Sequence, residues 1–131
     1  MDLNLFEQDL NETEPQDIGT LTPPYTDQNT PEEKVILAYH CLQRTLKLKS
    51  KPLSLQNAYF LGKALNEELD VYQRQRLKRR LTKHYLVMSE NAYDLFEVNP
   101  LQMLRVQYLT VQDIRRMKRS QILYLRKVLQ R

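Results

Sequence analysis

Glycine, cysteine and tryptophan are scarce in this chain of 131 residues, which holds two glycines, one cysteine and no tryptophan. Because glycine averages about 7% of protein sequences, glycine-rich phosphate loops and most tight hairpins are excluded. With Cys41 as the only cysteine, no intramolecular disulfide and no cysteine-based zinc site is available. A lone thiol fits a reducing compartment. We therefore expect a cytoplasmic protein that holds no metal and no cofactor.

Long apolar runs are also missing. No stretch approaches the roughly 20 apolar residues that a membrane-spanning helix needs. The first residues are acidic, whereas a secretory signal begins with basic residues. We expect neither a membrane span nor a signal peptide.

Basic residues are absent from the first 30 positions, which contain seven acidic residues and therefore carry a net charge of −7. Residues 31–131 hold all 20 basic residues and nine acidic ones, so their net charge is +11. Opposed charges of this kind indicate an acidic tail attached to a body that attracts polyanions.

The composition divides the chain at the same place. Residues 1–29 are polar and proline-containing, which predicts a disordered acidic arm. Residues 30–131 show apolar side chains at helical spacing, and we find no alternating pattern that would predict a strand. The predicted fold is all-α: a single small helical bundle of four main helices plus one or two short ones, preceded by the arm.

Cap residues and apolar spacing set the expected helix bounds. The first main helix covers about 30–47, and the second covers 54–69 and contains Gly62, which would permit a close helix crossing. The third runs from its cap at Asp70 to about residue 88, and the last runs from its cap at Thr110 to residue 129. Short helical segments are expected around 92–96 and after the Asn99-Pro100 pair.

Catalytic residues are not evident. His40 and Cys41 are neighbours in sequence, but neighbours on a helix point about 100° apart and do not pair. His84 lies among cations, which disfavour its charged form. Glu67, Glu68 and Asp70 cluster at one junction, where capping and solvation account for them. We expect a protein without enzymatic activity.

Two clusters of basic residues are the most informative feature. The first comprises Arg74, Arg76, Lys78, Arg79, Arg80 and Lys83, and the second comprises Arg115, Arg116, Lys118 and Arg119. Like charges repel within a helix, and phosphates would relieve that repulsion. We therefore expect a basic helical face that binds nucleic acid, although a solvated face is the simpler explanation for either cluster alone.

Other features bear on the same expectation. The segment 101–109 and the helix capped by Thr110 form a possible helix-turn-helix, whose second helix would present Gln112 together with the second basic cluster. Several tyrosines would be able to stack on unpaired bases, although core packing explains most of them. They are Tyr72, Tyr85, Tyr93, Tyr108 and Tyr124.

The tip of the arm carries a short apolar motif, Asp2-Leu3-Asn4-Leu5-Phe6. This motif resembles the peptide by which bacterial polymerases and repair factors dock on the DNA sliding clamp, in which a Gln precedes Leu-x-Leu-Phe. Leu3, Leu5 and Phe6 match that pattern, and Asp2 stands in place of the Gln. The resemblance implies a partner-docking peptide in a flexible tail.

These observations favour a non-enzymatic regulatory protein that binds DNA or RNA through its basic face. The acidic arm would either compete with nucleic acid in cis or dock a protein partner. The alternative is an adaptor or assembly factor that binds proteins and has no nucleic-acid role. The sequence leaves the oligomeric state open.

Overall fold

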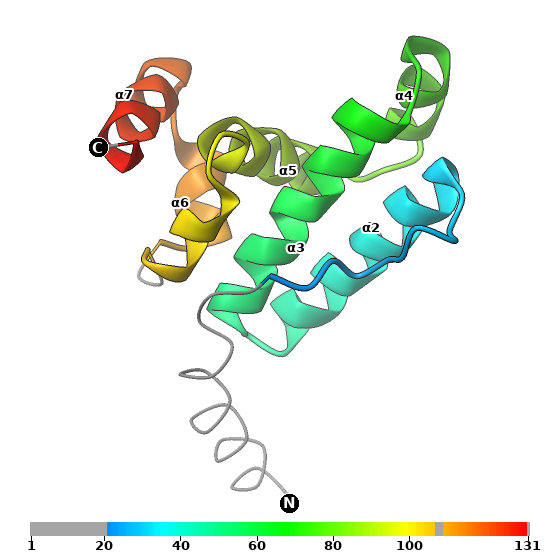
Figure 1. Cartoon of the computed structure of the whole chain (residues 1–131), viewed down its shortest axis with the longest axis horizontal. Helices are drawn as coiled ribbons and strands as arrows, with labels where there is room; N and C mark the ends of the chain where they lie inside the picture. The colour runs from blue at the N-terminus through cyan, green and yellow to red at the C-terminus, as the bar shows by residue number, and fades with distance from the viewer. Residues whose placement is uncertain (1–20, 107–108, 131) are drawn as a thin grey trace, which may run out of the picture.

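The computed structural model describes residues 21–106 and 109–130, and within these ranges every regular element is helical. This confirms the predicted all-α fold (Figure 1). The elements in chain order are α2 (Pro31–Lys47), α3 (Lys51–Lys63), the π-helix η1 (Ala64–Glu68), α4 (Val71–Lys78), α5 (Lys83–Phe96), the 3₁₀-helix η2 (Pro100–Leu104), α6 (Val111–Arg116) and α7 (Arg119–Leu129). No helix in the described ranges is both long and apolar enough to cross a membrane.

Three helices begin at the caps that the sequence predicts. The Thr30 hydroxyl accepts a hydrogen bond from the Glu33 amide at 3.2 Å, and the Glu33 carboxylate accepts one from the Thr30 amide at 2.9 Å. The same reciprocal capping box joins Asp70 to Gln73 and Thr110 to Asp113. Each box satisfies two amides that the first turn of the helix leaves without partners.

The predicted third helix is wrong in one respect, because it is two helices. α4 ends at Lys78 and α5 begins at Lys83, with Thr82 in an extended conformation between them. The Tyr39 hydroxyl of α2 lies 3.0 Å from the Thr82 hydroxyl and accepts a hydrogen bond from the Thr82 amide at 3.3 Å. A partner from another helix therefore stabilises the break. α5 then continues to Phe96 and includes the segment 92–96, which we expected to be separate.

The predicted last helix is also interrupted. Met117 and Lys118 are both extended, so α6 ends at Arg116 and α7 starts in a new direction at Arg119. No proline or glycine marks this position. After the break, two cations of α7 pair with carboxylates on α5 and at its C-cap, Arg119 with Asp94 and Arg126 with Glu97.

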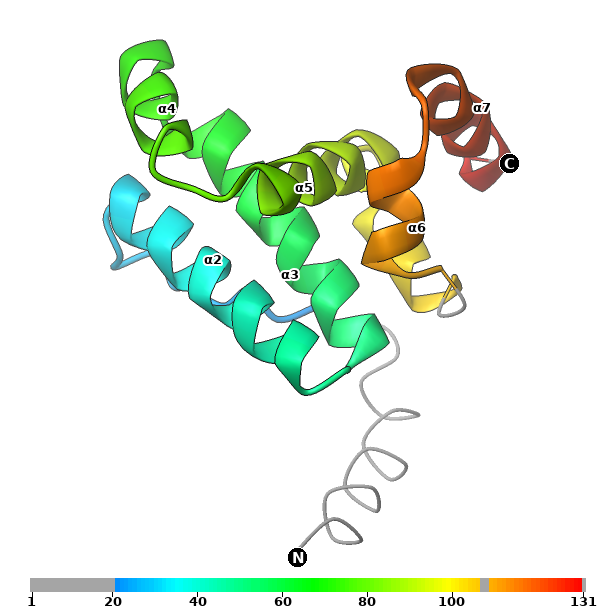
Figure 2. The same cartoon turned by 180° about the vertical axis from the view of Figure 1, so that it is seen from behind.

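Residues 21–29 differ from the expectation of a disordered arm over 1–29. Leu21 and Tyr25 pack against the hydrophobic core. The Tyr25 hydroxyl donates to the Phe60 carbonyl at 3.4 Å, and the two rings meet edge to face at 6.1 Å. The segment thus belongs to the body and lies alongside α2 and α3 (Figure 2). Residues 1–20, including the predicted docking peptide, lie outside the described residues.

The core is built on the crossing of α3 and α5, the two helices that make the most extensive contact. Gly62 of α3 faces Ser89 and Tyr93 of α5. A Cβ atom at Gly62 would lie only 2.8 Å from the Tyr93 Cβ and closer still to the Ser89 carbonyl oxygen. The expected close crossing is therefore confirmed. Residues buried around it include Leu61, Leu65, Met88, Ala92 and Phe96.

We predict that Gly62→Ala lowers the free energy of unfolding by about 2 kcal/mol, because the added methyl group overpacks the α3–α5 contact. In an open helix the same change would stabilise the protein by roughly 1 kcal/mol, so the sign is diagnostic. Urea denaturation followed by circular dichroism measures it. Lys51→Ala, at an exposed position of the same helix, is the control. Unchanged or increased stability of Gly62→Ala would contradict the close crossing.

Candidate nucleic-acid interface

The ten predicted contact cations lie in two places rather than on one face. The first cluster spans α4, the α4–α5 connection and the first residue of α5, and the second spans α6 and the start of α7. Figures 1 and 2 show α4 at one end of the molecule and α6 and α7 at the other, with α5 between them. α5 has 14 residues and is therefore about 21 Å long. The two clusters therefore form two groups, one towards each end of α5.

Arg74 of the first cluster has a structural role. Its Nε donates to the Leu65 carbonyl at 2.7 Å, and one terminal nitrogen reaches the carbonyls of Asn66 at 3.2 Å and Leu69 at 3.4 Å. These carbonyls belong to the end of η1, where the helix leaves acceptors without intrahelical partners. Because Arg74 points into this turn, we remove it from the set of candidate phosphate contacts.

Three further cations of the predicted set form ion pairs within the molecule. Arg76 of α4 pairs with Glu32 of α2. Lys78 pairs with Glu90 at 3.0 Å, and Arg119 pairs with Asp94 at 2.5 Å. These pairs are partly exposed, and exposed pairs stabilise a fold by at most about 1 kcal/mol. A phosphate would therefore compete for these cations at modest cost.

α5 supplies most of these carboxylates along one edge. Glu90, Asp94 and Glu97 follow one another at spacings of four and three residues, which places them on the same side of the helix. Arg126 of α7 pairs with Glu97 at 2.7 Å and donates to the Asp94 carbonyl at 3.1 Å. The acidic edge of α5 and its C-cap residue Glu97 thus pair with cations of both α4 and α7.

Cations without such partners remain on the surface. In the described ranges, no hydrogen bond or ion pair engages the side chains of Arg79, Arg80, Lys83 or Arg116, and all four are exposed. Arg115 donates to Gln112 of its own helix at 2.9 Å, and Lys118 is exposed at the N-cap of α7. We call Arg79, Arg80 and Lys83 the α4–α5 basic group. They lie within five consecutive residues of the chain, so an unrelieved positive charge is concentrated there.

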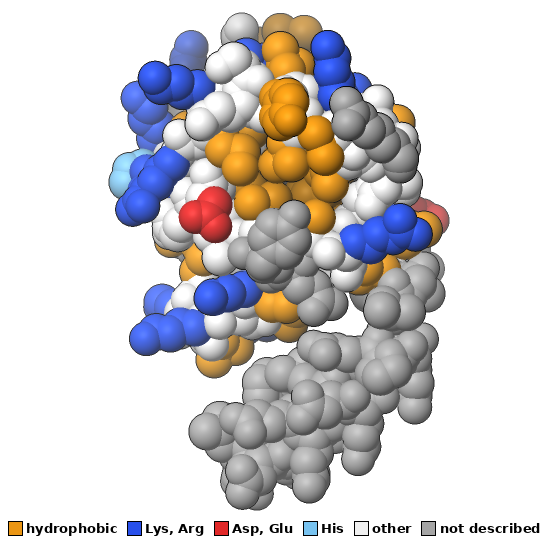
Figure 3. Space-filling model, turned by 90° about the vertical axis from the view of Figure 1, so that its left-hand side faces the viewer, with side chains coloured by type: hydrophobic (Ala, Val, Ile, Leu, Met, Phe, Trp, Pro, Cys, Tyr) orange, Lys and Arg blue, Asp and Glu red, His pale blue; other side chains and the backbone are white. Residues whose placement is uncertain are grey.

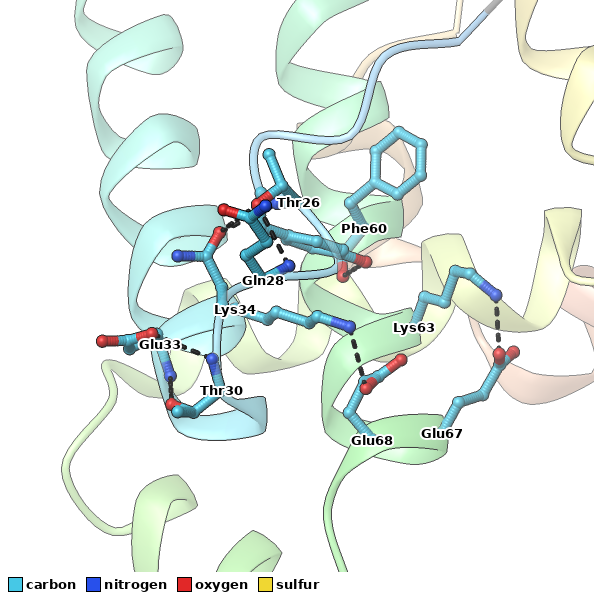
Figure 4. Close-up of polar contacts among 11 residues, drawn as sticks. Thr26, Gln28, Thr30, Glu33, Lys34, Phe60, Lys63, Glu67 and Glu68 are labelled. Atoms are coloured by element: carbon cyan, nitrogen blue, oxygen red, sulfur yellow. Dashed lines mark hydrogen bonds and ion pairs between the residues drawn. The ribbon is translucent and has the colours of Figure 1, made fainter.

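The carboxylate cluster of the sequence is neutralised by lysines. Lys34 of α2, which is only 8% exposed, pairs with Glu68 at 3.1 Å (Figure 4). Lys63 pairs with Glu67 at 2.6 Å, and the Tyr93 hydroxyl donates to Glu67 at 2.9 Å. These contacts join α2, α3, η1 and α5.

The pKa values of this cluster follow from the same contacts. Partial burial acts to raise the pKa of Glu67, but the hydrogen bonds from Lys63 and Tyr93 lower it overall. Burial, followed by the charges of Glu67 and Glu97, raises the pKa of Tyr59 to about 12. Burial, the hydrogen bond to Glu67 and that carboxylate's charge raise the pKa of Tyr93. Glu67 is therefore an ionised hydrogen-bond acceptor at neutral pH, whereas a general base benefits from a raised carboxyl pKa.

The helix-turn-helix expectation is wrong. Its first element is η2, a 3₁₀-helix of five residues, and α6 has only six residues before Met117 interrupts it. A recognition helix needs several consecutive turns to present side chains along a major groove. Of the residues it was to present, Arg115 and Gln112 bond to each other and Arg119 pairs with Asp94.

Two surface features were not singled out by sequence reasoning. A shallow hollow of about 70 Å³ on α4 is lined by Tyr72, Gln75, Arg76 and Arg79. At the α6–α7 end, Figure 3 shows apolar side chains gathered on the surface, with Lys and Arg side chains on either side of them and an acidic side chain nearby. The large exposed apolar residues of η2 and α7 are Leu101, Leu123, Tyr124 and Val128. The apolar residues of 119–129 occupy a wide face of the helix, and this pattern could have predicted an exposed apolar surface there.

Comparison of the chain with protein-family models, with curated proteins and with solved structures gives no match in any of the three. The function therefore has to be argued from the residues themselves.

We predict that Arg74→Ala lowers the free energy of unfolding by about 1.5 kcal/mol, because it removes charge-assisted hydrogen bonds to the carbonyls at the end of η1. Arg80→Ala, in the same cluster, should change stability by less than about 0.5 kcal/mol because its side chain is exposed. Chemical denaturation of both variants measures whether Arg74 contributes to stability and Arg80 does not. Equal losses would show that Arg74 and Arg80 do not differ in role.

Proposed function

We propose that this chain is a non-enzymatic regulatory protein that binds nucleic acid mainly through the α4–α5 basic group. The observation that carries the proposal is the exposure of Arg79, Arg80 and Lys83 without intramolecular partners in the described part of the chain. Phosphates neutralised by such cations release counterions, and this release drives association. Phosphate contacts position a protein and do not read sequence, so the proposal names no target sequence.

The α6–α7 end provides a second contact for phosphate. Arg116 and Lys118 are exposed there, and Arg119 forms an exposed pair that a phosphate would displace. Because α5 separates the two groups, a ligand that touches both must extend along the molecule. A strand of several nucleotides meets this requirement, since each nucleotide of an extended strand adds several ångströms.

The apolar surface at the α6–α7 end favours a second candidate function, the protein-binding adaptor. Exposed apolar side chains with cations on both sides of them fit a partner segment that is both apolar and acidic. The N-terminal peptide with Leu3, Leu5 and Phe6 remains a proposed docking site for a protein partner under either function. The nucleic-acid titration below separates the two functions.

We expect the double variant Arg79→Glu, Arg80→Glu to bind DNA and RNA at least tenfold more weakly at about 50 mM salt. Because two phosphate contacts are lost, the slope of log K against log salt should fall by about two. Fluorescence anisotropy with labelled oligonucleotides measures both quantities, and circular dichroism verifies that the variant is folded.

The matched control is Lys47→Glu, Lys51→Glu, which makes the same change in net charge at the α2–α3 connection. Both lysines are exposed, and one ends a helix where the other begins one, so their effects on the helix dipoles oppose each other. Equal weakening by both double variants would show that binding depends on net charge alone. Absence of binding by the natural chain at low salt would overturn the proposal and favour the adaptor.

Deletion of residues 1–20 should tighten nucleic-acid binding about threefold or more at low salt, with the difference disappearing at high salt because the charges are then screened. The deletion removes six of the acidic residues and no basic ones. It stops at residue 20 because Leu21 and Tyr25 pack on the core. Anisotropy titrations at two salt concentrations measure the change. Unchanged or weaker binding would contradict competition by the arm in cis.

A further inference from the structure

Tyr72 on α4 is a large aromatic residue that does not pack into the core. The Tyr72 side chain is 72% exposed, and the adjacent Val71 is 64% exposed. Other tyrosines of the described residues, such as Tyr39, Tyr59 and Tyr93, are buried or pack against the core. An exposed aromatic ring loses the apolar burial that would otherwise account for its presence.

The ring of Tyr72 lies beside an arginine that also forms an ion pair with another helix. The Arg76 guanidinium carbon is 5.9 Å from the centre of the Tyr72 ring, within the range of a cation–π contact. Arg76 also pairs with Glu32 of α2, so its guanidinium is tied to a neighbouring helix. The guanidinium lies over one part of the Tyr72 ring, and the side chain is otherwise exposed to solvent.

The groups around Tyr72 match the parts of a nucleotide. The shallow hollow next to the ring is lined by Gln75 and Arg79 as well as by Tyr72 and Arg76. A glutamine amide both donates and accepts hydrogen bonds, as the edge of a base requires. Arg79 is exposed and without a partner in the described residues, and a guanidinium binds phosphate oxygens in a bidentate manner.

We propose that Tyr72, Gln75 and Arg79 form a binding site for one unpaired nucleotide of single-stranded nucleic acid. The base stacks on the ring of Tyr72, Gln75 contacts the base edge, and Arg79 binds the adjacent phosphate. A base in a duplex is covered on both faces by its neighbours, so only a single strand presents a face to this ring. The inference rests on the proposed nucleic-acid function and specifies its ligand as single-stranded.

The chain offers a matched control. Tyr124 of α7 is 70% exposed, close to the value for Tyr72. Its neighbours three and four residues away are Ser120, Gln121, Lys127 and Val128, none of which is an arginine. Among the described residues the Tyr72 ring has an arginine guanidinium over it, and no such contact is found for Tyr124. The variants are therefore Tyr72→Ala, Tyr72→Phe and Tyr124→Ala in the full chain.

The experiment measures the affinity of each variant for fluorescein-labelled single-stranded DNA and RNA of mixed sequence and for the matching duplexes at about 50 mM salt. We expect the natural chain to bind the single strands at least fivefold more tightly than the duplexes. Tyr72→Ala should lose about tenfold on single strands and less than twofold on duplexes, because stacking contributes about this much per base. Tyr72→Phe and Tyr124→Ala should stay within twofold of the natural chain.

A second readout separates stacking from charge. Tyr72→Ala should leave the salt dependence of binding unchanged, because no phosphate contact is removed. An oligonucleotide containing 2-aminopurine should lose fluorescence on binding to the natural chain and regain most of it with Tyr72→Ala.

The outcomes distinguish this site from the broader function. If the natural chain binds neither single strands nor duplexes, the proposed function fails and the site fails with it. If it binds nucleic acid but Tyr72→Ala binds single strands as tightly as the natural chain, only the nucleotide site is overturned. Equal losses for Tyr72→Ala and Tyr124→Ala would also overturn it, because exposure alone would then explain the effect.

Discussion

The close approach of α3 and α5 at Gly62 is the contact on which the other elements depend. The glycine lets the Ser89 backbone and the Tyr93 side chain reach the surface of α3, and these two helices make the most extensive contact of the described elements. Tyr93 then reaches Glu67 of η1. The position of α5 also sets where its acidic edge lies, and that edge holds Lys78 of α4 and both Arg119 and Arg126 of α7. A Cβ atom at Gly62 would clash with Ser89 and Tyr93, so a larger residue there would push α5 away from α3.

The cations of this protein divide according to what surrounds them. Some cations bind carbonyls or carboxylates within the molecule, so their charge is already paired with an acceptor. They are Arg74, Lys34 and Arg126. Arg79, Arg80 and Lys83 follow the end of α4, where the chain turns towards α5 and no acidic residue is near in sequence. The net charge therefore overestimates the number of cations that are free to bind a polyanion. The charge that remains unpaired is concentrated, which matters more for a local contact than the total.

The separation of the basic groups changes the expected shape of a ligand. A compact anion would meet only one group, whereas an extended strand would follow α5 from one group to the other. The exposed ring of Tyr72 lies at the α4 end, next to Arg79. Stacking and phosphate contact at the same end favour a strand with accessible bases. Among the residues that the structure describes at the α6–α7 end, no arginine lies over an exposed aromatic ring, and the surface there is apolar instead.

Much of the fold was determined by the sequence itself. The capping boxes at Thr30, Asp70 and Thr110 and the helical spacing of apolar residues are local, so they predicted where helices begin. Local patterns did not predict the breaks at Thr82 and Met117–Lys118, where the contacts beside the breaks come from the distant Tyr39 hydroxyl of α2 and from Asp94 of α5. They also did not predict that Leu21 and Tyr25 pack on the core.

The ten candidate cations were identified from the sequence. Which of them are paired depends in several cases on partners more than 20 residues away, such as Glu32 for Arg76 and Asp94 for Arg119. Charge is a property of a residue, whereas its availability to a ligand is decided by the neighbours that tertiary packing brings to it.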